Sequence, residues 1–549
     1  MTKTSRPNIF IFMVDELRYP MTYDGAELRA WMDQYLVAQR LLRESGVDFR
    51  RHHTASTACA PSRTSIFTGQ YPSLHGVTQT DGLAKSAFDP GMHWLDPNTV
   101  PTLGDYFRAS GYRTFYKGKW HISFADIVVP GTHDSLATND DGGTPFPDRV
   151  ALYENADRLE DFGFSGWVGP EPHGAAKSNT GLVRDPGFAD QTTALLDQID
   201  GSPDDSPWLI VNSFVNPHDI VFFGIVWKLF GFQFSNETIP DIPEPPTQNE
   251  SLDSKPSCQA SYVDVYPKMV LPQPPIELYR KFYYYLQQQV DGHVLAVYER
   301  LKRSRFFDNT LIVFTSDHGE MLGAHGGMHQ KWYNAYQETI RVPLIFSGPL
   351  VSDAPRAVDG LTSHADLVPT LLGFAGVDVE QAQKELARNH TEVRRLVGRD
   401  LAAVVRGDAS VPAEPIYFMT SDNISSGLGQ VTGRTPYPAV VQPNQIETIV
   451  ADIDGLTWKY SRYFDDDPAL EQFEMYDLTA DPTEERNLVD PRFATPVSEA
   501  MRPKLAAILD EQRTLKRLQP LETDASQRVD GEGWSPDGHP ELATADQTF

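Results

Sequence analysis

The chain has 549 residues, of which 40% are hydrophobic and 11% aromatic, and its formal net charge at pH 7 is −28. This length suggests two domains, and the apolar content is ample for globular folding. A surface this acidic repels nucleic acid and anionic membranes, so we expect neither as a partner. An anionic ligand would need a local pocket of positive charge.

The only two cysteines, Cys59 and Cys258, do not indicate a disulfide framework. That usage is typical of a reducing compartment, and we expect a cytoplasmic protein. The apolar run 8–14 ends at Asp15 without a small-residue cleavage site, so it is interpreted as a buried strand rather than a signal peptide. No run approaches the length of a membrane span.

Several continuous apolar runs are typical of parallel strands buried on both faces, and polar side chains follow directly on them. The runs 9–14, 113–116, 208–214 and 311–315 deliver, in turn, Asp15, Lys119 with His121, His218, and Asp317 with His318. A lone strand-end aspartate is more often a helix cap, and a lone histidine is more often structural. Ligands bind at the carboxyl ends of strands in open α/β sheets, so together these groups could converge on one crevice.

The segment 57–69 reads as a loop that turns into a short helix. Pro61 suits the first helical position and Gly69 suits the stop. Cys59 then lies at the helix mouth, where the macrodipole favours negative charge, and Arg63 shares its face. From the residues alone, Cys59 is either a small core hydrophobe or a thiolate nucleophile of lowered pKa.

Other segments define the expected organisation. Residues 277–304 carry an apolar stripe at helical spacing and predict a long amphipathic helix. The stretch 124–178 looks like surface excursions. The aromatic segment 222–234 leads into the proline-rich segment 240–275, where we expect no regular structure and either a lid or a subunit contact.

The pattern changes after residue 400. We expect a catalytic α/β domain over 1–400 and a C-terminal subdomain over 401–517, with an antiparallel sheet (446–451, 456–460, 473–476) and a helix (497–515). The acidic tail 518–549 is expected to be disordered or to form an arm that orders on a neighbouring subunit, which makes a homo-oligomer possible.

The motif Cys59-x-Pro61-Ser62-Arg63, followed by Phe67-Thr68-Gly69, resembles the type I sulfatase signature. Similar blocks recur at 8–15, 118–121, 216–218, 315–319, 341–344, 475–478 and 481–482, so the resemblance covers roughly residues 7–488. It implies the alkaline-phosphatase-like fold, in which a large mixed α/β sheet lies between helices beside a smaller C-terminal α+β domain.

The resemblance implies that Cys59 is oxidised to formylglycine, an aldehyde, by a formylglycine-generating or sulfatase-maturing enzyme. It places one divalent metal ion, Ca²⁺ or Mn²⁺ foremost, on Asp15, the modified Cys59, Asp317 and His318. Many sulfatases have a second aspartate where this chain has Glu16, and asparagine where it has His318. His318 resembles the choline sulfatase and phosphonate monoester hydrolase branch, so the role of Glu16 and the metal's identity are open.

The same resemblance assigns the remaining roles. His218 protonates the leaving oxygen, Lys119 and Lys331 hold the sulfuryl oxygens, and Arg63 steadies the hydrated aldehyde. His121 accepts a proton when sulfate leaves. Lys331 belongs to Gln330-Lys331-Trp332-Tyr333, which resembles the family's lysine block with a changed spacer; it could also be an ordinary solvated lysine.

These features indicate hydrolysis of small-molecule sulfate monoesters of the arylsulfatase type, with side activity on phosphate diesters or phosphonate monoesters. One alternative is a phosphonate monoester hydrolase or phosphodiesterase as the main activity. Lys119 and His121 favour the sulfatase, whereas His318 favours this alternative. The other is a non-catalytic binding protein, if Cys59 stays unmodified. Against it, buried charges without a use are costly.

Overall fold

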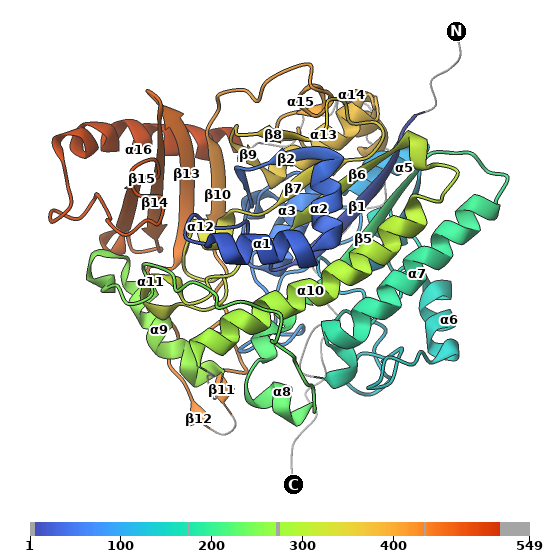
Figure 1. Ribbon diagram of the computed structural model, residues 1–549, viewed down its shortest axis with the longest axis horizontal. Helices are drawn as coiled ribbons and strands as arrows, with labels where there is room; N and C mark the ends of the chain where they lie inside the picture. Colours follow the sequence, from blue (N-terminus) through green and yellow to red (C-terminus); the bar gives the residue numbers. More distant parts are fainter. Residues whose placement is uncertain (1–5, 173–175, 271–274, 433–434, 517–549) are drawn as a thin grey trace, which may run out of the picture.

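The computed structural model describes residues 6–172, 176–270, 275–432 and 435–516. Its centre is a seven-stranded sheet in the order β4-β5-β1-β6-β7-β2-β8 (Figure 1). In that order the strands are Arg113–Gly118, Trp208–Pro217, Asn8–Asp15, Thr310–Ser316, Leu344–Ser347, Gly46–Phe49 and Arg356–Val358. The first four run parallel, whereas β7 runs antiparallel to both neighbours, so the sheet is mixed.

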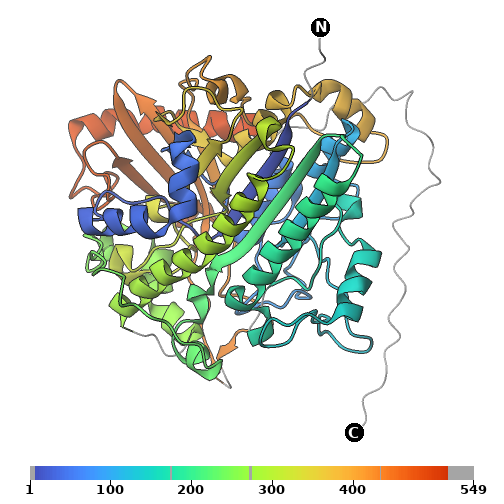
Figure 2. The ribbon, with the colours of Figure 1, turned by 45° about the vertical axis from the view of Figure 1, so that its right-hand side comes forward.

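Helices pack on both faces of this sheet, because its central strands β1, β5 and β6 are apolar and buried along their whole length. One face is covered by α7 (Gly181–Gly201) and α10 (Ile276–Leu301), which lie in front of it in Figure 2. The other face packs against α3 (Cys59–Thr68), α5 (Leu103–Ala109) and α13 (Leu367–Phe374). The predicted large mixed sheet between helices is confirmed.

A second sheet lies beside the first. Its antiparallel order is β10-β13-β14-β15, with bounds Ile416–Thr420, Gln445–Ile453, Leu456–Phe464 and Gln472–Asp477. The helix α16 (Pro496–Lys516) packs on it through Leu505 and Leu509 (Figure 1). The three strands and the helix that the sequence predicts here are present, and the tail 518–549 lies outside the described residues.

The domain boundary near residue 400 stays a prediction. The short helix α15 (Ala402–Arg406), just beyond it, packs into the core of the larger sheet. The remaining helices are α1 (Ala26–Tyr35), α2 (Val37–Glu44), α4 (Pro72–His75), α6 (Pro147–Ala156), α8 (Ile225–Leu229), α9 (Ser257–Met269), α11 (Ala324–Gly327), α12 (Gln337–Ile340) and α14 (Val379–Leu386). Two small ladders pair β3 (His52–His53) with β9 (Thr362–Ser363) and β11 (Val431–Thr432) with β12 (Thr435–Pro436).

The expectation of no regular structure over 240–275 is wrong. The proline-rich segment contains α9, which buries Cys258, Tyr262 and Tyr266 in a cluster with the loop after β6 and the C-terminal sheet. Pro267 lies in the last turn of α9 and removes a backbone hydrogen bond, so packing must stabilise this helix. The stretch 124–178, expected to form surface excursions, contains the mostly exposed helix α6, which begins at Pro147. Among the described residues, none of the helices combines the length and apolar character needed to cross a membrane.

Candidate active site

The strand register brings the predicted groups to one edge of the large sheet. In β1, Asp15 pairs with Pro217 of β5, and Val14 pairs with Ser316 of β6. The residues that follow these strands therefore emerge side by side at the carboxyl ends. Lys119 follows β4, which is the next strand beyond β5.

The helix α3 carries Cys59 to the same edge. Cys59 is its first residue, and Gly69 ends it in the left-handed conformation, with φ of 64°, as expected. Pro61 is the third helical residue rather than the first, a position whose N–H also lacks an intrahelical partner. Every residue of α3 is buried, so the helix mouth opens into the protein and not onto its surface.

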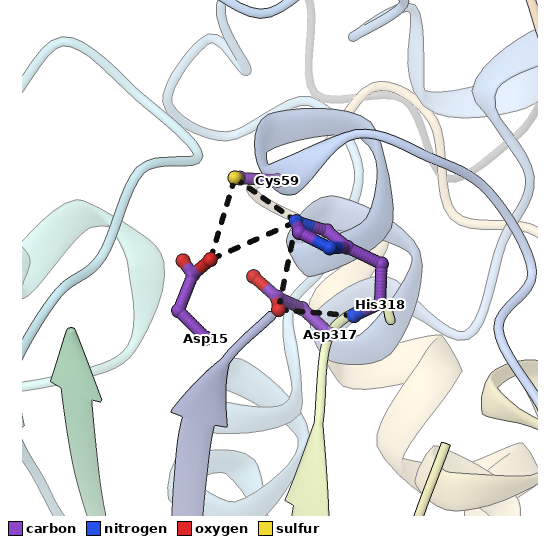
Figure 3. A group of neighbouring side chains, drawn as sticks. All are labelled: Asp15, Cys59, Asp317 and His318. Carbon is purple, nitrogen blue, oxygen red and sulfur yellow. Dashed lines mark hydrogen bonds and ion pairs between the residues drawn. The ribbon is translucent and has the colours of Figure 1, made fainter. Parts of the chain in front are cut away.

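Four side chains meet at this edge and form what we call the ligand group (Figure 3): Asp15, Cys59, Asp317 and His318. One ligand atom from each lies within 4.8 Å of the others. The Cys59 Sγ is 3.1 Å from His318 Nε2 and 3.6 Å from Asp15 Oδ1. His318 Nε2 lies 3.7 Å from Asp15 Oδ1 and 3.8 Å from Asp317 Oδ1. The four atoms thus surround one point.

Buried cations bind the outer carboxylate oxygens of the ligand group, which are the Oδ2 atoms of Asp15 and Asp317. Arg63 donates from one nitrogen to Asp15 Oδ2 at 2.9 Å and from another to Asp317 Oδ2 at 2.8 Å. Lys119 Nζ lies 2.7 Å from Asp15 Oδ2. Burial raises the pKa of Asp15, but the charges of Lys119, His218 and Arg63 outweigh it and hold this pKa well below its usual range. Asp15 is therefore ionised, with its Oδ1 facing the other ligand atoms.

The backbone orients the other two ligands. His318 Nδ1 lies 3.0 Å from the carbonyl oxygen of Gly319, so a proton on Nδ1 leaves the Nε2 lone pair facing the ligand group. Asp317 Oδ1 accepts the N–H groups of Glu16 and His318, each at 3.0 Å. Two carboxylates with one imidazole nitrogen form a donor set that fits a divalent cation such as Ca²⁺ or Mn²⁺.

Lys331 and His218 meet at a carboxylate that lies outside the ligand group. Glu16 Oε2 accepts from Lys331 Nζ at 2.9 Å and lies 3.0 Å from His218 Nδ1. The Lys331 side chain is fully buried; burial lowers its pKa, but neighbouring acidic groups, Glu16 and Asp15 among them, outweigh burial and raise this pKa, so the ammonium stays charged. The solvated-lysine reading of Lys331 is therefore wrong. The sequence left the role of Glu16 open, and its partners lie too far away in the chain for spacing to predict them.

His121 is held beside the site by a residue that the sequence did not point to. Its Nε2 lies 2.7 Å from Asp81 Oδ1, and its ring packs against Trp94 with centroids 5.7 Å apart. Asp81 belongs to a loop without regular structure, and no spacing signal connects it to His121. His121 follows Lys119 by two residues in the chain. Neither of these two contacts involves a member of the ligand group.

The Cys59 thiol itself is not an activated nucleophile. Burial, and next the charge of Asp15, raise its pKa, although Lys119 and Lys331 act in the opposite direction. A thiolate is the reactive form of cysteine, so the helix mouth does not compensate for the loss of solvent. The thiolate interpretation of the signature is therefore disfavoured by the geometry.

Fold and site together define a buried group of carboxylate, thiol and imidazole ligands, with the basic side chains of Arg63, Lys119 and Lys331 beside it. The family model for Sulfatase matches residues 7–377, more than half of the chain, and the chain belongs to the sulfatase family. It is accordingly a sulfuric ester hydrolase.

Named relatives agree with this assignment. The chain is 28% identical over 502 residues to the choline-sulfatase of Rhizobium meliloti, covering 89% of this chain and 83% of that protein. It is 24% identical to the arylsulfatase of Clostridium perfringens, covering 72% and 80% of the two chains. The phosphonate monoester hydrolase of Agrobacterium radiobacter has a similar fold, with a TM-score of 0.59 and 19% identity over 92% of this chain and 96% of that one.

Proposed function

We propose that this protein hydrolyses small-molecule sulfate monoesters of the arylsulfatase type, using a formylglycine made from Cys59 and one divalent cation. The observation that carries this proposal is the meeting of Cys59 with two ionisable carboxylates and an imidazole, beneath Arg63 and Lys119. The raised pKa of the thiol supports conversion of Cys59, because the unmodified side chain is a poor nucleophile.

Conversion would have to precede folding. Cys59 is only 1% exposed and lies in a helix that is buried throughout. A formylglycine-generating or sulfatase-maturing enzyme could not reach it in the native protein. Cys258 is also buried and unpaired, which is compatible with the reducing, cytoplasmic compartment that we expect.

The cation and the aldehyde supply the chemistry that the unmodified chain lacks. When bound, a divalent cation would lower the pKa of a hydroxyl on residue 59 and provide a nucleophile near neutral pH. The aldehyde hydrate offers one hydroxyl to attack sulfur, and a second hydroxyl whose loss of a proton expels sulfate and restores the aldehyde.

The chain's own residues would then bind the ester and move protons. Lys119 and Lys331 hold the sulfuryl oxygens, because both are buried cations next to residue 59. Arg63 keeps Asp15 and Asp317 in place. His121, oriented by Asp81, would accept the proton of the second hydroxyl.

His218 would protonate the leaving oxygen. Its side chain is 9% exposed, more than those of the ligand group, which suits a position at the mouth of the site. Burial and the charge of Lys119 lower its pKa despite Asp15, so a bound anionic ester would supply the negative charge that favours imidazolium.

A second candidate is hydrolysis of phosphonate monoesters or phosphate diesters as the main activity. His318 and the fold shared with a phosphonate monoester hydrolase favour it. Sulfate monoesters, phosphate diesters and phosphonate monoesters are singly charged at neutral pH, whereas phosphate monoesters are almost doubly charged. Asp15 and Asp317 offset part of the cation's charge, so we expect aryl sulfates to exceed phosphate monoesters in kcat/KM.

The test is a kinetic panel on protein co-expressed with a formylglycine-generating enzyme. Matched aryl esters of sulfate, phosphate and phosphonate, with one phosphate diester, are compared, and the peptide containing Cys59 is weighed by mass spectrometry. We expect a peptide lighter by about one water and the highest kcat/KM for the sulfate. Full activity with an unmodified thiol, or a higher kcat/KM for the phosphate monoester, would overturn the proposal, and a fully converted protein inert to every ester would indicate a binding protein.

A further inference from the structure

Glu16 holds two of the proposed catalytic residues at one oxygen. Its Oε2 lies 2.9 Å from Lys331 Nζ and 3.0 Å from His218 Nδ1. Lys331 comes from the loop after β6 and His218 from the end of β5, and the two are 315 and 202 residues away from Glu16 in the chain. A single carboxylate oxygen therefore joins groups delivered by two different strands.

The position of this oxygen is set by the backbone at the end of β1. Glu16 has a φ of 73°, an uncommon left-handed conformation for a residue other than glycine. Its N–H donates to Asp317 Oδ1 at 3.0 Å, and its carbonyl oxygen accepts from the Tyr283 hydroxyl at 2.8 Å. The residue is fully buried. Strained backbone that is held at both ends is typical of sites where a side chain must be aimed.

The two partners need such a restraint. The ammonium of Lys331 is at the end of a flexible stem, and the hydrogen bonds to Glu16 and to Gln330 Oε1, at 3.2 Å, limit where it lies. The contact between Glu16 Oε2 and Nδ1 of His218 restrains the orientation of the imidazole ring, and with it the direction in which Nε2 points.

We propose that Glu16 is a positioning residue that ties Lys331 to His218 across the site, and that it is not a ligand of the metal. The inference rests on the proposed function, because it concerns the residues that would hold the sulfuryl group and protonate the alcohol. It departs from the family pattern, in which an aspartate at this position would be expected beside the cation.

The competing interpretation is that Glu16 ligates a cation together with Asp15 and His218, whose ligand atoms also lie within 4.8 Å of one another. Lys331 argues against it, because its ammonium lies 2.9 Å from Oε2 of the same carboxylate and would repel a metal cation bound to that oxygen. Glu16 is also absent from the ligand group, although it is adjacent to Asp15.

The experiment separates the two roles by measuring metal and leaving-group dependence on the same proteins. Glu16→Ala and Glu16→Gln are purified, their bound metal is measured by elemental mass spectrometry, and kcat/KM is measured over aryl esters of graded leaving-group pKa. We expect the metal content of wild type in both variants. Glu16→Ala should lose on the order of 10²-fold in kcat/KM on the poorest leaving group and less than about tenfold on the best. Glu16→Gln, which keeps an acceptor oxygen, should recover much of the loss.

Two further variants make the result specific. Glu338→Gln removes another fully buried glutamate that contacts neither Lys331 nor His218, and it should leave the leaving-group dependence unchanged. Glu16→Ala should lower kcat/KM much less in the His218→Ala background than in wild type, because the histidine that Glu16 positions is already gone.

Loss of metal from Glu16→Gln would overturn the inference. It would also be overturned if Glu16→Ala lowered kcat/KM equally for all leaving groups and lowered it by the same factor in the His218→Ala background as in wild type. If Glu16→Ala does not fold, the metal content of Glu16→Gln still decides whether Glu16 is a ligand, because an amide is a much weaker ligand than a carboxylate, and the dependence of its kcat/KM on the leaving group tests the positioning role. The proposed function fails by a different result, namely that wild type hydrolyses no sulfate ester. In that case the variants are compared on whichever ester class wild type cleaves. The metal content can be measured without any substrate.

Discussion

Among the described residues, two buried clusters of histidine and carboxylate that share no residue each bring their ligand atoms within 4.8 Å of one another, and they differ in where their cations lie. The second, which we call the interdomain cluster, consists of His325, Glu338, Glu484 and Lys459. Ligand atoms of its histidine and two glutamates also lie within 4.8 Å of one another. It joins the loops after β6 to the C-terminal sheet, whereas the ligand group lies at the carboxyl ends of the central strands.

The difference lies in where the lysine is. In the interdomain cluster Lys459 lies against Glu484 and against the carbonyl oxygen of Ala335, so the chain supplies its own cation between the acidic groups. His325 lies 2.6 Å from Glu250 Oε1 and 3.8 Å from Glu338 Oε2. In the ligand group, Arg63 and Lys119 cover only the outer oxygens. Proximity of acids and histidine is common to both clusters, and the position of the buried cations distinguishes them.

The largest expected effect comes from removing the reactive side chain. Cys59→Ala should lower kcat/KM for an aryl sulfate by on the order of 10⁴-fold or more, because the nucleophile is lost. Its melting temperature should stay within a few degrees of wild type, as a small buried group is exchanged for another. Residual activity above about one per cent of wild type would show that residue 59 is not the nucleophile.

Metal binding should distinguish the two clusters. Asp317→Asn removes one carboxylate ligand and should strip the protein of its divalent cation and of turnover, as should exhaustive chelation, with activity restored by adding Ca²⁺ or Mn²⁺.

Glu484→Gln is the matched control in the interdomain cluster, and it should keep the wild-type metal content, measured by elemental mass spectrometry. If Glu484→Gln lost the metal and Asp317→Asn kept it, the comparison between the two clusters would be reversed.

Breaking the interdomain cluster should cost stability rather than chemistry. Lys459→Met leaves Glu484 and its neighbours without their cation in a buried site and should lower the free energy of unfolding by about 3–5 kcal/mol. Denaturant titration measures this loss.

Replacing both partners, in Lys459→Met/Glu484→Gln, should return part of that stability, because no uncompensated charge is left buried. A double variant less stable than the single one would contradict this account.

The smallest effect concerns a buried histidine that belongs to neither cluster. Burial lowers the pKa of His75 to about 3, and its ring lies 3.1 Å from the Ser65 hydroxyl. Below the unfolded pKa of about 6.5, the unfolded chain binds the proton and the native protein does not. Stability is therefore lost as pH falls from about 6.5 toward 3, by about 1.4 kcal/mol per pH unit for this one residue.

His75→Gln should reduce the pH dependence of the unfolding free energy by that amount between pH 6 and 4, measured by denaturant titration at each pH. An unchanged slope would mean that His75 is protonated in the native protein.

The sequence by itself determined the parts whose signal is local. Continuous apolar runs identified β1, β5 and β6, and the stripe of α10 identified a long helix, because burial on two faces or on one leaves a direct pattern in the residues. The polar residues directly after those strands were predicted to meet, since parallel strands share a carboxyl edge, and the structure brings Asp15, Asp317 and His318 together with Cys59.

Only the tertiary structure decided the partnerships. Glu16 meets Lys331 across 315 residues, and Lys459 meets Glu484 from a neighbouring strand and loop; neither spacing carries a signal. The helix α9 escaped prediction because the prolines of its segment suggest irregular chain, while the packing that stabilises it comes from distant segments. Whether a buried acid serves a ligand or a lysine depends on which distant cation reaches it, and the fold alone settles that.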